Sequence, residues 1–134
     1  MTRAKHPPGL SDANLAVLFR KAVLKHYGYR CIICGQGGEL EVHHCVHRGQ
    51  AKLLRWDWRN GVPVHHGDCH AAANRMGRLA ADVEFQDYIE FLARKTIKQY
   101  LADEGITEAM WRGAVKAALL AELAAAEGGE RNEG

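Results

Sequence analysis

The stretch LEVHHCVHRGQAKLLRWDWRNGVPVHHGDCH, from Leu40 to His70, decides the fold predicted for this chain. Its first residues alternate in the overlapping run ELEVHH, which is typical of a short strand. Asn60–Gly61 is a turn signal, and the GVPV run after it suits a second strand that Pro63 confines to a sheet edge. A helix is then expected to begin near Gly67 or Asp68. Two short strands and a helix predict a small α+β core.

Two pairs of metal-ligand residues flank this stretch. CIICG places two cysteines at x-x spacing before a glycine, and HHGDCH offers a histidine and a cysteine. Thiolates and imidazoles in such pairs bind tetrahedral zinc. The x-x spacing favours His66 over the adjacent His65, and a redox CxxC is disfavoured because no βαβ pattern surrounds it. The predicted structural zinc ligands are Cys31, Cys34, His66 and Cys69, with His65 as the alternative to His66.

Helical patterns lie on both sides of the core. Ser11 can cap a helix that Gly28 ends, and two helices are expected later, one from Asp82 to Gly105 and one after Thr107. The C-terminal helices are expected either to pack on the first helix or to pair with a second copy of the chain as a homodimer. The predicted division is a flexible start and N-terminal helix (1–30), the core with its zinc site (31–80) and a C-terminal helical extension (81–134).

Composition and charge restrict the function classes. The 134 residues favour one domain, and neither a membrane span nor a secretory signal is evident, so a cytoplasmic protein is expected. The formal net charge is only +2, but residues 1–80 hold 12 Lys/Arg against 5 Asp/Glu. All eight histidines also lie in these 80 residues. The excess positive charge therefore lies in the part of the chain that holds the histidines. It favours an anionic partner such as nucleic acid.

His43, His44 and His47 are crowded into five residues. This crowding has three explanations: chance in a polar loop, a zinc knuckle, or a site where one histidine binds a metal and another acts on water. The last suits phosphodiester cleavage, because a divalent cation can stabilise the phosphate and the departing oxygen. A neutral histidine can activate the water as a general base.

The core motifs resemble the HNH endonucleases, the ββα-metal nucleases. The resemblance consists of a His-His pair on a strand, then RNG containing Asn60, then CH with His70 opening a helix, and it covers about residues 31–75. The outer cysteine pairs resemble the zinc-stapled branch of that family, and RWDWRNG resembles phage and prophage members. Two features depart from the usual pattern: the closing histidine lies ten rather than nine residues after the asparagine, and a histidine replaces one expected cysteine.

The resemblance implies a metal-dependent enzyme that hydrolyses DNA phosphodiester bonds to 5′-phosphate and 3′-hydroxyl ends. Its expected cofactors are structural Zn²⁺ and a catalytic Mg²⁺, Mn²⁺, Ni²⁺ or Zn²⁺. The implied roles are metal ligand for His43 and His70, general base for His44, orientation of the loop and the base for Asn60, an additional metal ligand for Asn74, and phosphate binding for Arg48 and Arg55.

The alternative is a non-catalytic zinc-ribbon module for DNA binding or assembly. Such a module needs only the four zinc ligands, and the presence of His43, His44, Asn60 and His70 together favours the enzyme. Two other features stay open. Trp56 and Trp58 either stack on bases or pack beneath the zinc site, and Cys45 is expected to be a small buried apolar residue.

Overall fold

The computed structural model describes residues 6–46, 52–81, 92 and 95–133. Within these residues it is a small α+β protein with four α-helices and one antiparallel two-stranded sheet. No helix among these described residues has the length and apolar character needed to cross a membrane. The elements in chain order are α1 (Asp12–His26), β1 (Glu41–His44), the 3-10 turns η1 (Lys52–Leu54) and η2 (Trp58–Asn60), β2 (Gly61–Val64), α2 (Asp68–Met76), the 3-10 turn η3 (Gly77–Ala80), α4 (Ile97–Glu104) and α5 (Glu108–Glu133).

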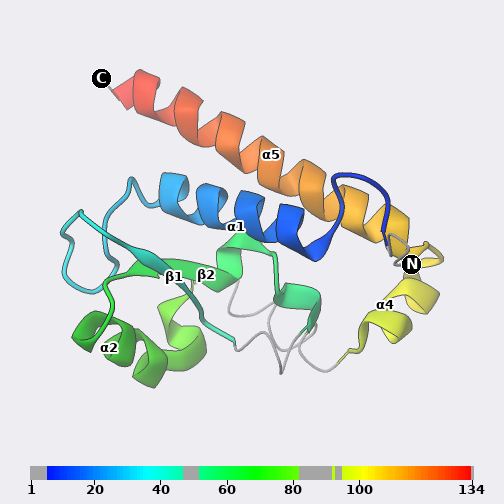
Figure 1. Ribbon diagram of the computed structural model, residues 1–134, viewed down its shortest axis with the longest axis horizontal. Coiled ribbons are helices and arrows are strands. Elements are labelled where there is room, and N and C mark those ends of the chain that lie inside the picture. Colours follow the sequence, from blue (N-terminus) through cyan, green and yellow to red (C-terminus); the bar gives the residue numbers. More distant parts are fainter. Residues whose placement is uncertain (1–5, 47–51, 82–91, 93–94, 134) are drawn as a thin grey trace, which may run out of the picture.

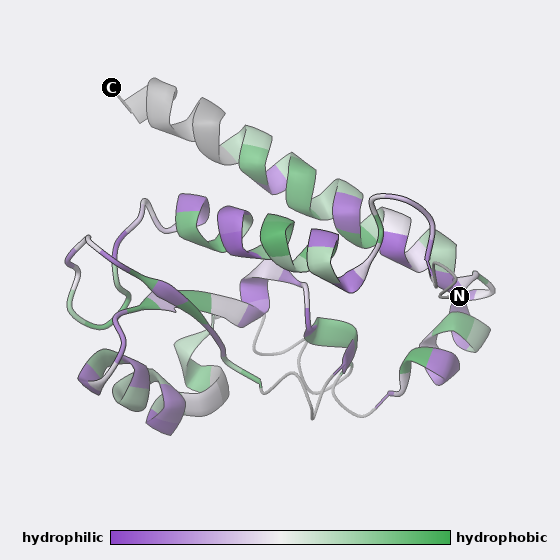
Figure 2. Ribbon diagram, viewed as in Figure 1, coloured by the Kyte–Doolittle hydropathy of each residue, from purple (hydrophilic) through white to green (hydrophobic). Residues whose placement is uncertain are grey.

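The elements are stacked in layers (Figure 1). The long helix α5 lies along α1, α1 lies on the sheet, and α2 covers the other side of the sheet. Polar and apolar residues alternate along α1 and α5 in Figure 2, so apolar side chains can gather where the two helices meet. The expectation that the C-terminal helices pack on the first helix is therefore confirmed for α5, and pairing with a second copy stays a prediction.

The first helix forms as its sequence predicts. The hydroxyl of Ser11 accepts a hydrogen bond from the backbone N–H of Asn14, which caps the helix start. At the other end Gly28 has φ +64°, a conformation that glycine adopts without steric cost. The buried face between these ends consists of Leu15, Phe19, Ala22 and Val23.

At Gly61 the side chains of α1 lie directly against the sheet. A Cβ atom at this position would lie 2.7 Å from Cζ of Phe19 and 2.8 Å from Cγ2 of Val23, which is too close for any side chain. Gly61 pairs with His44, and Val62 pairs with His43, in the antiparallel register of β1 and β2. The glycine of the RNG motif therefore lets a helix pack directly on the strand pair.

The C-terminal extension differs from its prediction at one boundary. Helix α4 begins at Ile97, because Thr96 and Gln99 form a reciprocal capping box. A helix running unbroken from Asp82 to Gly105 is therefore wrong at Thr96, and residues 82–91 and 93–94 lie outside the described residues. Gly105 ends α4 in the left-handed conformation, as predicted. The hydroxyl of Thr107 accepts a hydrogen bond from the N–H of Met110 at the start of α5.

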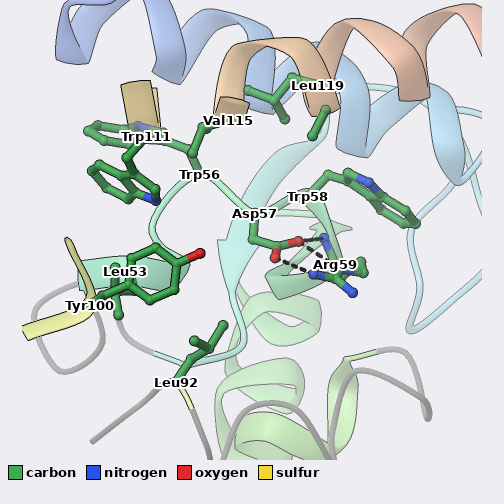
Figure 3. A pocket seen from close by; sticks show the side chains of 11 residues that line it. Leu53, Trp56, Asp57, Trp58, Arg59, Leu92, Tyr100, Trp111, Val115 and Leu119 are labelled. Carbon is green, nitrogen blue, oxygen red and sulfur yellow. Dashed lines mark hydrogen bonds and ion pairs between the residues drawn. The ribbon is translucent and has the colours of Figure 1, made fainter. Parts of the chain in front are cut away.

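The tryptophans of the core pack against the helices instead of the zinc site. Trp56 is 5% exposed, and its ring lies 6.4 Å from that of Trp111 on α5. Trp58 packs on His26 of α1 at 4.2 Å between ring centroids. The rings of Trp56, Trp111 and Tyr100 line a cavity of about 370 Å³ (Figure 3), beside the ion pair of Asp57 and Arg59. Neither interpretation of these tryptophans is therefore confirmed.

Candidate metal centre

Three cysteines and one histidine converge next to the sheet. The ligand atoms of Cys31, Cys34, His65 and Cys69 all lie within 4.8 Å of one another. Tetrahedral zinc with bonds of about 2.0–2.3 Å places its ligands roughly 3.3–3.8 Å apart, so small side-chain adjustments would close this cluster around an ion. The residues can therefore hold one zinc ion.

The first cysteine pair forms a tight knuckle. The N–H of Gly35 donates to the carbonyl of Cys31 at 2.9 Å, and the N–H of Ile33 lies 3.4 Å from Sγ of Cys31. Although burial raises the pKa of Cys31, hydrogen bonds from the backbone of Cys34, His65 and Ile33 lower it to about 6. The knuckle thus favours the thiolate, which is the form that binds metal.

The histidine in the cluster is His65, which corrects the preference for His66. Nε2–H of His65 donates to the carbonyl of Gly37 at 2.6 Å, which raises the pKa of the ring and leaves Nδ1 as the ligand atom. That Nδ1 lies 3.3 Å from Sγ of Cys34. The side chain of His66 is 92% exposed and lies near Glu41 instead. The x-x spacing failed here because the β2–α2 turn aims consecutive side chains in different directions.

The other thiols have distinct environments. Burial and the neighbouring thiols of Cys31 and Cys34 raise the pKa of Cys69 to about 11, so the metal-free cluster resists full ionisation and a dication would relieve the repulsion. Cys45 is 6% exposed, and burial raises its pKa to about 12. Cys45 is therefore the buried apolar residue that was expected.

A pair of histidine side chains connects the sheet to α2. Nδ1 of His43, on β1, lies 3.1 Å from Nε2 of His70, in the first turn of α2. With metal–nitrogen bonds of about 2.1 Å, adjacent ligands lie about 3.0 Å apart in octahedral and about 3.4 Å apart in tetrahedral geometry. The separation of the two nitrogens is therefore compatible with two ligands of one cation.

Glu41 lies beside this pair, and it was not among the predicted site residues. Its carboxylate accepts a hydrogen bond from Nδ1 of His70, and this bond lowers the pKa of the carboxyl below its ordinary range. The sequence does contain a feature that could have identified Glu41. Side chains alternate between the two faces of a strand, so Glu41 and His43 lie on the same face of β1.

His44 faces the opposite way from His43. Its ring stacks on Phe19 of α1 with the centroids 4.8 Å apart and the planes 12° from parallel. Nε2 of His44 lies 2.8 Å from the carbonyl oxygen of Arg55. Because a carbonyl only accepts hydrogen bonds, Nε2 carries the hydrogen in the neutral ring and Nδ1 is its basic nitrogen.

The side chain of Asn60 forms hydrogen bonds with the backbone just after β1. Its side chain is fully buried, and Oδ1 accepts a hydrogen bond from the N–H of Val46 at 2.8 Å. Nδ2 donates to the carbonyls of Val46, at 3.1 Å, and of Leu54, at 3.2 Å. The amide therefore connects the end of β1 to the segment that carries the carbonyl partner of His44.

The remaining predicted site residues have other surroundings. The guanidinium of Arg55 lies 3.5 Å from a carboxylate oxygen of Asp12 and over the ring of Trp56. Asn74 is exposed on α2, one turn after His70. Arg48 lies outside the described residues.

Comparison with known proteins gives no relative. No family model, no curated protein and no solved structure matches this chain.

Proposed function

We propose that this chain is a metal-dependent HNH-type endonuclease that hydrolyses phosphodiester bonds in DNA. The observation that carries the proposal is the 3.1 Å approach of His43 Nδ1 to His70 Nε2 across the β1–α2 contact. Its support is that this pair lies in a strand–strand–helix unit next to a cysteine-rich cluster, and that His43, His44, Asn60 and His70 follow one another along the chain in the order of the motif.

In this proposal His43 and His70 hold a divalent cation. When bound, the cation supplies Lewis acidity to the phosphate and the departing oxygen. His44 accepts a proton from water at Nδ1, while Nε2–H stays bonded to the carbonyl of Arg55. The water oxygen attacks phosphorus, the bond from phosphorus to the 3′ oxygen breaks, and that oxygen takes a proton from solvent.

Asn60 holds the loop so that the Arg55 carbonyl keeps its place against the His44 ring. Binding of DNA is supported by charge: the first 80 residues carry 12 Lys/Arg against 5 Asp/Glu. Contacts to phosphates give such binding its salt dependence and most of its nonspecific affinity.

A non-catalytic zinc-ribbon module is the second candidate. The Cys31, Cys34, His65 and Cys69 cluster favours it, since a structural zinc needs no reaction. The two candidates differ in metal content: the module binds one zinc, whereas the enzyme binds a second cation that depends on His43 and His70.

The test is cleavage of supercoiled, linear and single-stranded DNA with Mg²⁺, Mn²⁺, Ni²⁺ or Zn²⁺. We expect cleavage by the wild-type protein and a loss of roughly 10²-fold or more in His70→Ala at moderate metal concentration. His6→Ala is the matched control, because His6 lies beside Glu108 on α5 and outside the site. The result that favours the non-catalytic zinc-ribbon module is a folded, zinc-loaded protein that binds DNA but cuts none of these substrates with any metal.

A further inference from the structure

The carboxylate of Glu41 lies between His66 of the β2–α2 connection and His70 of α2. Its Oε1 accepts a hydrogen bond from Nδ1 of His70, and its Oε2 lies 3.5 Å from Nδ1 of His66. Glu41 is the first residue of β1, and His43 follows two positions later on the same face of the strand. One strand therefore carries both a member of the histidine pair and the carboxylate that contacts the other member.

We propose that Glu41 is a positioning residue that prepares His70 to bind the cation. This inference rests on the proposed function, because it concerns the same histidine pair. A carboxylate only accepts hydrogen bonds, so Nδ1 of His70 carries the hydrogen and Nε2 keeps its lone pair. Nε2 is the atom that faces His43 at 3.1 Å. Glu41 thus selects both the tautomer and the ring orientation that a cation needs at His70.

Glu41 acts through His70 and not as a ligand of the same cation. The N–H bond at Nδ1 and the lone pair at Nε2 point in diverging directions, so a cation on Nε2 lies across the ring from the carboxylate on Nδ1. A carboxylate on the far nitrogen of a metal-binding histidine also makes that histidine a stronger ligand. Losing such a partner typically costs about 10-fold to 100-fold in metal affinity.

The alternative is a surface ion pair that would contribute little. It is disfavoured because the partner of His70 on its other side, His43, is only 9% exposed, which fixes the ring between two elements. His66 is 92% exposed, so its contact with the second carboxylate oxygen of Glu41 is weaker. An accidental contact would leave the tautomer of His70 undetermined, and this difference is measurable.

Glu39 provides the matched control. It carries the same charge two residues earlier in the chain, is exposed, and borders the same surface groove as Glu41 and His66. A general electrostatic effect on cations would therefore act through both carboxylates, whereas positioning of His70 depends on Glu41 alone.

The first measurement needs neither a second cation nor DNA. Nitrogen-15 spectra of histidine-labelled, zinc-loaded protein report which ring nitrogen of His70 carries the hydrogen, with His70→Gln to assign the signal. We expect the Nδ1–H tautomer in the wild-type protein and in Glu39→Gln. Glu41→Gln should give a mixture, because the amide can either accept or donate.

The second measurement is calorimetric titration with Ni²⁺, with zinc content checked before and after. Glu41→Gln should bind Ni²⁺ about 10-fold to 100-fold more weakly than wild type, whereas Glu39→Gln should bind as wild type does. DNA cleavage by Glu41→Gln should recover toward the wild-type maximum at saturating Ni²⁺, because the substitution weakens only the binding of the metal.

These measurements distinguish a failure of the proposed role of Glu41 from a failure of the proposed function. An unchanged His70 tautomer together with unchanged Ni²⁺ affinity in Glu41→Gln overturns the role of Glu41. Wild-type protein that binds no Ni²⁺ and cuts no DNA overturns the proposed function instead, and the tautomer of His70 still decides whether Glu41 positions that ring.

Discussion

Cys69 and His70 are neighbours in the first turn of α2, yet they belong to two different clusters. Sγ of Cys69 lies with Cys31, Cys34 and His65, while Nε2 of His70 lies 3.1 Å from Nδ1 of His43. The N–H of His70 also donates to the carbonyl of His65 at 3.0 Å. The same short segment therefore carries residues of both clusters, and binding of zinc should fix the position of the His43–His70 pair.

The adjacent pair His65 and His66 gives the sharpest test of the zinc cluster. His65→Ala should lose zinc and melt at a much lower temperature, because structural zinc supplies roughly 10 kcal/mol or more of apparent binding energy in small modules. His66→Ala should keep one zinc per chain. Elemental analysis and thermal unfolding measure both variants, and zinc retained in His65→Ala but lost in His66→Ala would restore the original preference.

His44→Ala distinguishes the proposed general base from the proposed metal ligands His43 and His70. Zinc content, Ni²⁺ affinity and DNA affinity should stay close to wild type, while cleavage falls roughly 10²-fold or more because no group accepts the proton from water. High metal concentration should partly rescue His43→Ala but not His44→Ala. Single-turnover cleavage at fixed metal and pH measures this, and wild-type rates in His44→Ala would remove the general-base assignment.

Asn60→Ala should destabilise the fold. The variant leaves the N–H and the carbonyl of Val46 without the amide, whereas the carbonyl of Leu54 still accepts from the N–H of Asp57. Each buried group left unsatisfied costs about 1–3 kcal/mol. We expect a loss of about 2 kcal/mol or more in urea denaturation. Asn14→Ala, at an exposed position of α1, is the control. A loss for Asn60→Ala no larger than that for Asn14→Ala would contradict this account.

Cys45 should make stability depend on pH in the alkaline range. Burial raises its pKa from the ordinary 9.0 to about 12, so the unfolded chain loses this proton before the folded protein does. Its contribution is fully present below pH 9.0 and is lost as the pH rises toward about 12. Up to about 1.4 kcal/mol per pH unit is lost through this one group.

Denaturation of zinc-loaded protein at several alkaline pH values tests this sign. The free energy of unfolding should fall less steeply with pH in Cys45→Ala than in the wild-type protein, because the alanine has no proton to lose. Equal slopes would show that Cys45 ionises as readily in the folded protein as in the unfolded chain.

The amino-acid sequence by itself determined the local elements. The cap at Ser11, the apolar period after it and Gly28 were enough to predict α1, and alternation in ELEVHH predicted β1. The thiol pair CIICG likewise indicated a metal knuckle, since its two cysteines are close along the chain. These features depend on contacts within a few residues, where residue type and spacing govern the outcome.

Only the tertiary structure decided which side chains meet across elements. Spacing could not separate His65 from His66, because the choice depends on the path of the β2–α2 turn through Gly67 at φ +92°. Glu41 gained a role only when α2 folded back on β1 and brought Nδ1 of His70 to its carboxylate. Such contacts depend on how the chain closes loops of many residues, and a local pattern carries no information about that closure.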